Sequence, residues 1–274
     1  MFSFVRAETM RLLRRKATVT VFWCLMFFVL TNFVGNVLKE YSQIYVSQMF
    51  AIPKVLTFST WSIAGIFVRL LYPMLVLVPT SLVFYQDSKI NEKAYILSRI
   101  PGRKYYLGKT VSGFIVTFVL FVIPFFIEIF LSVICLESSA NGDPAYIPLH
   151  DSITSQSSFL FLSGFYVKHR IIYSAMMILL FGIISGILAV FNMAFSILIR
   201  NKYSLFALVP VFALLMLSGN LYGRVTSFQT NYYSLSSLFL KGRYDYGYYA
   251  ALIVAILAVT ILIIIFKQNK DDCL

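Results

Sequence analysis

Charged residues are scarce in this sequence. Only 12% of its 274 residues are Asp, Glu, Lys or Arg, whereas about a quarter of the residues in a typical soluble domain are charged. Hydrophobic residues make up 59% of the chain, and its mean hydropathy is +0.82. The composition therefore predicts a membrane protein and leaves little sequence for a soluble catalytic domain.

Histidine and cysteine are also rare, which limits metal and disulfide chemistry. The two histidines, His150 and His169, lack the helical spacing of metal ligands, so no metal site is expected. Cys24 is predicted inside a span, Cys135 at the outer rim and Cys273 in the tail. Because these positions lie apart, no intramolecular disulfide is expected.

A phosphate-binding loop is missing too. Residues 100–110 end in Gly-Lys-Thr, but Gly102 and Gly108 are separated by five residues rather than four, and these are bulky or charged. The preceding residues have helical spacing, where such a loop needs a strand. This chain is therefore not expected to bind ATP itself, so any ATP hydrolysis should occur in another chain; no catalytic residues, no cofactor and no enzyme activity are expected here.

Long apolar runs are what the sequence does contain. A helix needs about twenty apolar residues to cross a hydrocarbon core of about 30 Å. Such runs cover residues 19–37, 62–84, 111–136, 172–198, 203–221 and 248–266. The predicted fold is a single all-α membrane domain, residues 1–274, with six transmembrane helices and a large outer loop at 137–170.

The basic residues predict the orientation of these spans. Lys and Arg are concentrated before the first span, between the second and third, between the fourth and fifth, and after the sixth. Cytoplasmic loops carry such an excess, so both termini are predicted to be cytoplasmic in a cell membrane. The net charge of +12 needs no nucleic-acid partner, because the lipid bilayer's anionic headgroups and an acidic protein surface suffice.

Residues 1–17 form an amphipathic pattern ahead of the first span. Phe2, Val5 and Leu12 fall on one helical face, with Arg11 and Arg15 opposite. This pattern is typical of a helix lying in the membrane interface. The alternative is a basic cytoplasmic tail.

A second amphipathic segment, residues 87–100, is predicted between the second and third spans. Asp87 or Ser88 can cap a short helix, and Pro101 followed by Gly102 ends it. A short cytoplasmic helix closed by a sharp turn can fit a cleft on another protein, or it can simply keep the two spans in register. The residues assigned to the docking surface are Asp87, Ile90, Ala94, Leu97, Pro101, Arg103 and Lys109.

This segment resembles the first cytoplasmic loop of type-2 permeases of ATP-binding-cassette transporters. The similarity lies in an acidic residue, a helical run, Leu97, Pro101-x-Arg103 and Gly108-Lys109. In that family the loop forms the coupling helix, which docks on the ATPase subunit.

Two further stretches are similar to the same family, and two features depart from it. Residues 1–17 look like its interfacial elbow helix, and Leu217-Ser-Gly219 is similar to its Leu-Ser-Gly turn. However, Asn91-Glu92 stands where Gly-Thr is frequent, and the proline-rich stretch after the fifth span is missing. These departures leave the subfamily, and with it the substrate, open.

The resemblance implies a permease subunit of an exporter. Two chains, identical or homologous, would form the pathway, and two separate ATPase subunits would bind ATP and Mg. Because the spans hold few charges, the expected substrate is an amphipathic or antimicrobial peptide or another hydrophobic compound. The alternatives are a secondary transporter and an intramembrane enzyme not driven by ATP.

Two pairs of residues inside the predicted spans are expected to hold neighbouring helices together. Arg69 and Glu128 lie at about the same depth in antiparallel spans, and an unpaired charge there costs about 3 kcal/mol or more. We expect them to form an ion pair, either as a brace or as a gate. Gly182 and Gly186 form a small-residue step that permits close helix approach.

Overall fold

The computed structural model describes residues 2–41, 52–57, 62–81, 83–89, 92–136, 165, 168–198 and 246–272. Within these ranges the chain forms helices and turns and no strand, so the predicted all-α class is confirmed for them. The helices are α1 (Phe2–Leu13), α2 (Lys16–Tyr41), α3 (Ile52–Val55), α4 (Ile63–Leu77), α5 (Val83–Lys89), α6 (Glu92–Leu97), α7 (Gly102–Cys135), α10 (Arg170–Leu198) and α13 (Tyr246–Asp272).

Three of these helices are long and apolar enough to cross a membrane. The qualifying segments are Lys16–Leu38 in α2, Gly102–Cys135 in α7 and Arg170–Ile197 in α10, and α13 contains the shorter apolar segment Ile253–Gln268. They indicate a membrane protein. The fifth predicted span, 203–221, and nearly all of the 137–170 loop lie outside the described residues, so the number of six spans stays a prediction.

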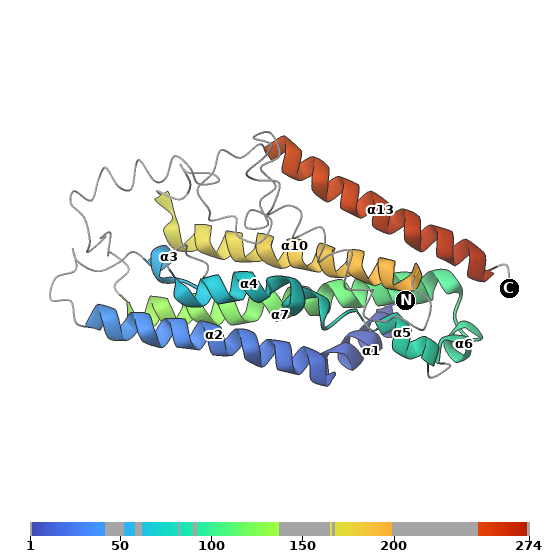
Figure 1. The fold of residues 1–274 in the computed structure, drawn as a ribbon, viewed down its shortest axis with the longest axis horizontal. Coiled ribbons are helices and arrows are strands. Elements are labelled where there is room, and N and C mark those ends of the chain that lie inside the picture. The colour runs from blue at the N-terminus through green and yellow to red at the C-terminus, as the bar shows by residue number, and fades with distance from the viewer. Residues whose placement is uncertain are drawn as a thin grey trace.

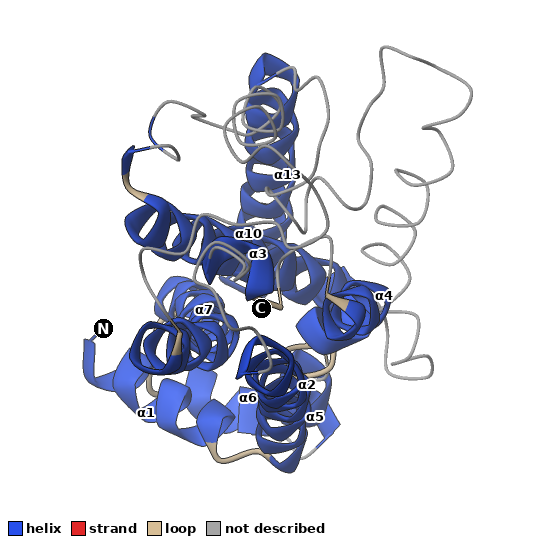
Figure 2. Cartoon of the chain, turned by 90° about the vertical axis from the view of Figure 1, so that its left-hand side faces the viewer, coloured by secondary structure: helices blue, strands red, loops and turns tan. Residues whose placement is uncertain are grey.

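The long helices form an antiparallel bundle (Figure 1). Helices α2 and α7 run in one direction, and α4, α10 and α13 run in the other. One end of the bundle carries α3, whereas α1, α5 and α6 gather at the opposite end together with the last turn of α13. Seen along the bundle, α7 and α10 lie at its centre (Figure 2), packed against each other and against most of the remaining helices.

Aromatic side chains fill the middle of the bundle. Tyr72 of α4 lies with its ring centroid 5.1 Å from that of Phe181 on α10 and 5.7 Å from that of Phe121 on α7. The Tyr72 hydroxyl is 3.0 Å from the Ser185 hydroxyl of α10. A buried tyrosine needs such a partner for its polar end, so this contact fixes the register of α4 against α10.

The second predicted span, 62–84, is not one continuous helix. Helix α4 ends at Leu77, residues 78–81 form a turn, and α5 begins at Val83. Pro79 lies in this turn; it has no backbone N–H and disfavours helical geometry in the residue before it. Because Ser81 N still donates to Leu77 O at 2.9 Å, the chain keeps turning and α5 leaves the bundle at its end.

The predicted 87–100 helix needs correction, and the helix of the third span begins before the predicted apolar run. Two short helices, α5 and α6, replace the single helix, and Ile90 between them lies outside the described residues. The third span was expected to begin at residue 111, but α7 begins at Gly102, directly after Pro101. Its 34 residues extend about 50 Å at 1.5 Å per residue, well beyond a hydrocarbon core of about 30 Å.

The two glycines of the predicted small-residue step lie where α10 crosses α7. A Cβ added at Gly182 would lie 2.4 Å from Val122 Cγ2, and one added at Gly186 would lie 2.6 Å from the Phe114 ring. Larger residues at either position would push the two central helices apart.

We predict that Gly182→Ala lowers the melting temperature of the reconstituted protein, because overpacking a close contact costs about 1–3 kcal/mol. Gly35→Ala is the matched control, since an added Cβ there meets nothing within 4 Å and alanine favours a helix over glycine. Thermal unfolding of both variants in nanodiscs checks this. Equal melting temperatures for the two variants would show that α10 does not pack this tightly.

Candidate functional site

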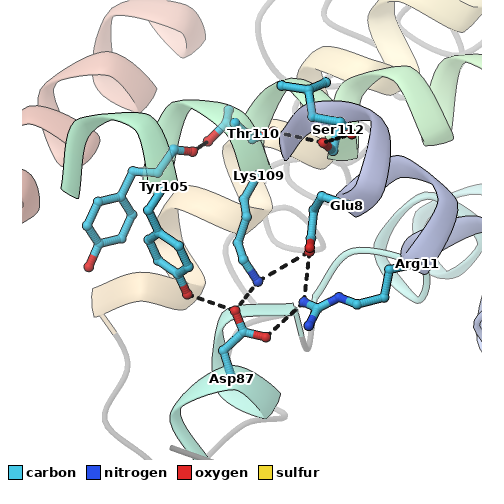
Figure 3. Close-up of polar contacts among 10 residues, drawn as sticks. Glu8, Arg11, Asp87, Tyr105, Lys109, Thr110 and Ser112 are labelled. Atoms are coloured by element: carbon cyan, nitrogen blue, oxygen red, sulfur yellow. Dashed lines mark hydrogen bonds and ion pairs between the residues drawn. The ribbon is translucent and has the colours of Figure 1, made fainter. Parts of the chain in front are cut away.

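Five polar side chains from three helices meet at the end of the bundle that carries α1, α5 and α6 (Figure 3). Glu8 and Arg11 come from α1, Asp87 from α5, and Tyr105 and Lys109 from α7. We call these five residues the polar cluster. They are far apart in the sequence, so the cluster exists only because α1 and α5 both pack against the first turns of α7.

Each carboxylate of the polar cluster faces both cations. The Lys109 ammonium donates to Asp87 Oδ2 and lies 3.2 Å from Glu8 Oε1. Arg11 Nη2 lies 2.8 Å from Glu8 Oε1 and 2.9 Å from Asp87 Oδ1. The Tyr105 hydroxyl donates to Asp87 Oδ2 at 2.7 Å. Two negative and two positive charges therefore cancel within the cluster.

Most of the polar cluster is removed from solvent. The side chains of Lys109 and Asp87 are 0% and 1% exposed, whereas Arg11 keeps 32% of its surface. The Lys109 nitrogen also lies 5.1 Å from the Tyr105 ring centroid and 5.8 Å from that of Phe84. Removing one member of such a buried pair leaves an uncompensated charge, which costs about 3–5 kcal/mol.

The electrostatics of Asp87 follow from these partners. Burial alone would raise the pKa of its carboxyl group, because burial penalises the charged form. The neighbouring Lys109 charge and the hydrogen bonds from Lys109, Tyr105 and Arg11 outweigh burial and hold the pKa below its usual range. Asp87 therefore stays ionised at neutral pH.

Local sequence explains how α1 comes close enough to contribute two residues. Glu8 and Arg11 are three positions apart, so they lie on one face of α1. A Cβ added at Gly108 would lie 2.5 Å from the Phe4 ring, which shows how closely α1 lies on α7 there. The Ser112 hydroxyl adds a contact 3.1 Å from the Val5 carbonyl oxygen.

Two of the predicted docking residues need correction. Asp87 and Lys109 were assigned to a surface that contacts a partner, but both side chains are buried and bonded within this chain. Asp87 also lies inside α5 rather than at a helix cap. The reason is tertiary: Asp87 binds side chains of α1 and α7 instead of backbone N–H groups of its own segment.

Other predicted docking residues do lie on the surface. Ala94, Pro101 and Arg103 are exposed around α6 and the start of α7. Leu97 is half-buried and packs against the apolar residues around the polar cluster. This contact anchors α6 to the end of the bundle.

The predicted docking surface left out three exposed neighbours of these residues, Tyr95, Arg99 and Lys104. The Arg99 guanidinium lies 4.3 Å from the Tyr95 ring centroid, a cation–π contact, and Lys104 is exposed in the first turn of α7. The α6 patch, as we name it, consists of Ala94, Tyr95, Arg99, Pro101, Arg103 and Lys104. It presents cations and one aromatic ring, which suits an acidic protein surface.

Sequence reasoning also missed the role of Glu8, Arg11 and Tyr105 in the polar cluster. Glu8 carried a usable signal, because it is the first acidic residue of a strongly basic amino-terminal segment and the next is Glu40. Such an isolated acid on a basic helix suggests a specific partner. No local signal identifies Tyr105, whose neighbour Tyr106 is equally buried.

Glu128 lies near the opposite end of α7 and is bound by groups that the sequence did not suggest. Its Oε1 accepts hydrogen bonds from Asn32 Nδ2 at 2.9 Å, from Thr57 N at 2.8 Å and from Thr57 Oγ1 at 2.7 Å. These contacts fasten the segment after α3 to α2 and α7. Arg69 lies on α4, but its side chain lies outside the described residues, so the ion pair with Glu128 stays a prediction.

Comparison with known proteins adds no assignment. Neither the family models, nor the curated proteins, nor the solved structures contain a match to this chain. Within the described ranges no group of His, Cys, Asp and Glu could hold a metal ion. The polar cluster and the α6 patch are therefore the features of this chain that indicate a function.

Acidification tests the charge state of Asp87. Because its pKa lies below the unfolded value of about 3.9, its ionised form contributes stability that is complete above that value and is lost as pH falls through the folded pKa. We predict that the wild type melts at a higher temperature than Asp87→Asn at pH 7, and that the difference shrinks below about pH 4. A difference that grows on acidification would contradict this assignment.

Proposed function

We propose that this chain is the permease subunit of an ATP-binding-cassette exporter. Two chains with six spans each form the pathway, and a separate ATPase docks on the α6 patch of each. The resemblance of residues 87–109 to the type-2 permeases motivates the proposal. The main support from the structure is that the exposed, cationic α6 patch is attached directly to three packed helices, α1, α5 and α7.

Because the α6 patch is attached to α1, α5 and α7, a movement of the patch would move these helices as well. Arg103 and Lys104 lie in the first turn of α7, the helix that continues as the third predicted span. Asp87, at the end of α5, joins α1 and α7 through the polar cluster. A displacement of the patch by a docked ATPase would therefore move α1, α5 and α7 together. Such rigid-body motion is a common form of switching.

The distance of the patch from the membrane favours a protein partner over lipid headgroups. Arg103 precedes the predicted membrane entry at Val111 by eight residues, or about 12 Å along a helix parallel to the membrane normal. The headgroup layer adds about 5–7 Å on each side of the hydrocarbon core. With this predicted entry, the patch would lie beyond the headgroups, where the acidic surface of an ATPase could reach it.

The substrate follows from the polarity of the spans. An apolar pathway suits an amphipathic or antimicrobial peptide, or another hydrophobic compound, better than an ion or a sugar. Among the buried charged groups, Asp87 and Lys109 are paired within the polar cluster, and Glu128 accepts hydrogen bonds through its Oε1. They are therefore bound within the fold instead of lining a charged pathway.

Co-purification from the native membrane tests the docking. The tagged wild-type chain is expected to retain a second protein that hydrolyses ATP, and the double variant Arg99→Glu/Arg103→Glu is expected to lose most of that activity. Lys168→Glu is the matched control. Lys168 is also an exposed cation, but it lies before α10, at the end of the bundle away from the α6 patch.

Two results would contradict the proposal. One is equal ATP hydrolysis in preparations of the double variant and of Lys168→Glu. The other is ATP hydrolysis by the isolated chain, since that would make it an enzyme in its own right.

A further inference from the structure

Three buried polar side chains in the bundle have no hydrogen-bond partner among the residues that the structure describes. They are Thr80 in the turn after α4, Thr117 on α7 and Asn192 on α10, and each is 0% exposed. The unbonded atoms are the two threonine hydroxyls and both the Oδ1 and the Nδ2 of Asn192. Each unsatisfied buried group costs about 1–3 kcal/mol. A bound molecule that supplies the missing hydrogen bonds would remove this cost.

The register of α4 and α10 brings Thr80 and Asn192 to one level. The two helices run in the same direction (Figure 1), and the contact between Tyr72 and Ser185 aligns them. Thr80 is eight residues beyond Tyr72, and Asn192 is seven residues beyond Ser185. Asn192 therefore lies about 10 Å further along α10 at 1.5 Å per residue, and Thr80 lies in the turn just after the end of α4.

Helix α7 closes this region from the third side. A Cβ added at Gly113 would lie 2.3 Å from Met193 Sδ and 3.8 Å from Thr80 Cγ2. Gly113 therefore touches both the turn that holds Thr80 and the residue after Asn192. Thr117 is four residues further along α7, on the same helical face. Thr80 and the segment of α10 that carries Asn192 therefore meet α7 near Gly113, and Thr117 lies one helical turn away on α7.

The depth of this region excludes bulk solvent as the partner of these groups. Thr117 is six residues beyond the predicted membrane entry at Val111, and Asn192 is six residues before the predicted exit at Leu198. With these predicted bounds, both residues would lie about 9 Å inside the hydrocarbon core at 1.5 Å per residue. Polar residues at such depth are frequent along transport pathways.

We propose that Thr80, Thr117 and Asn192 form a binding site for a small neutral group that both donates and accepts hydrogen bonds. Two hydroxyls and one carboxamide offer both functions and no charge. The group is therefore a hydroxyl or an amide, supplied either by an ordered water or by the head of an amphipathic molecule. This site is independent of ATPase docking and goes beyond the proposed function.

Hydroxyl-radical labelling by X-ray irradiation tests the site, because radicals formed from a bound water oxidise the methionine beside it. The reporter is Met193, which is 0% exposed, and the control is Met177, which is 1% exposed on the same helix. In nanodiscs, Met193 is expected to oxidise severalfold faster than Met177. The variant Thr80→Val/Thr117→Val/Asn192→Leu is expected to reduce its rate to that of Met177.

A titration with decanamide, a neutral amphipath with a carboxamide head, separates the two sources. Protection of Met193 but not of Met177 assigns the site to the amphipath. Fast labelling of Met193 that decanamide does not change assigns it to water.

Two results would overturn the proposal. The first is oxidation of wild-type Met193 no faster than that of Met177, a comparison that requires no variant to fold. The second is a higher melting temperature for Asn192→Leu than for the wild type, because removing an amide that is bonded to an occupant is expected to lower the stability of the protein.

Discussion

The buried ion pair between Lys109 and Asp87 is the interaction on which the end of the bundle near α6 depends. Neither charge has access to water, and each is compensated by the other and by Glu8, Arg11 and Tyr105. The compensation needs all three helices in place. If α1, α5 and α7 separated, a buried charge would lose its partner or become exposed. The polar cluster thus adds a charge constraint to the apolar contacts that the same three helices make around it.

This constraint explains why α6 can be both exposed and fixed. The helix has only six residues, too few to be stable alone. Its inner side, through Ile96 and Leu97, packs on the apolar residues around the polar cluster, and Pro101 joins the following turn directly to α7. The α6 patch therefore moves with α7, which is the property that a docking surface for an energy-supplying partner requires.

Much of the helical framework could be predicted from the sequence, because apolar runs of about twenty residues have few alternatives in a membrane protein. Helix α10 was predicted within two residues of its start. The small-residue step at Gly182 and Gly186 could be found from spacing alone. By contrast, the start of α7 was missed by nine residues, because residues 102–110 are polar and are stabilised by α1 and α5 instead of by lipid.

The polar sites were harder to predict, since their partners are distant in the sequence. Asp87 has the local pattern of a helix cap, but Lys109 is 22 positions away and Arg11 is 76. For Glu128, the only opposite charge at its depth suggested Arg69, whereas the donors to its Oε1 are the uncharged Asn32 and Thr57. Pairing charges by depth overlooks neutral donors that a short helix such as α3 brings to the same place.

Hydrogen–deuterium exchange of the α1 amides in nanodiscs tests whether the polar cluster holds α1 against α5 and α7. Lys109→Met removes the buried ammonium and leaves Glu8 and Asp87 uncompensated, whereas Lys104→Met changes an exposed lysine of the same helix. The account predicts that Lys109→Met accelerates exchange across residues 2–13 by at least about tenfold, because opening becomes easier by more than 1.4 kcal/mol, and that Lys104→Met leaves it unchanged. Equal protection of α1 in the two variants would show that the polar cluster does not hold these helices together.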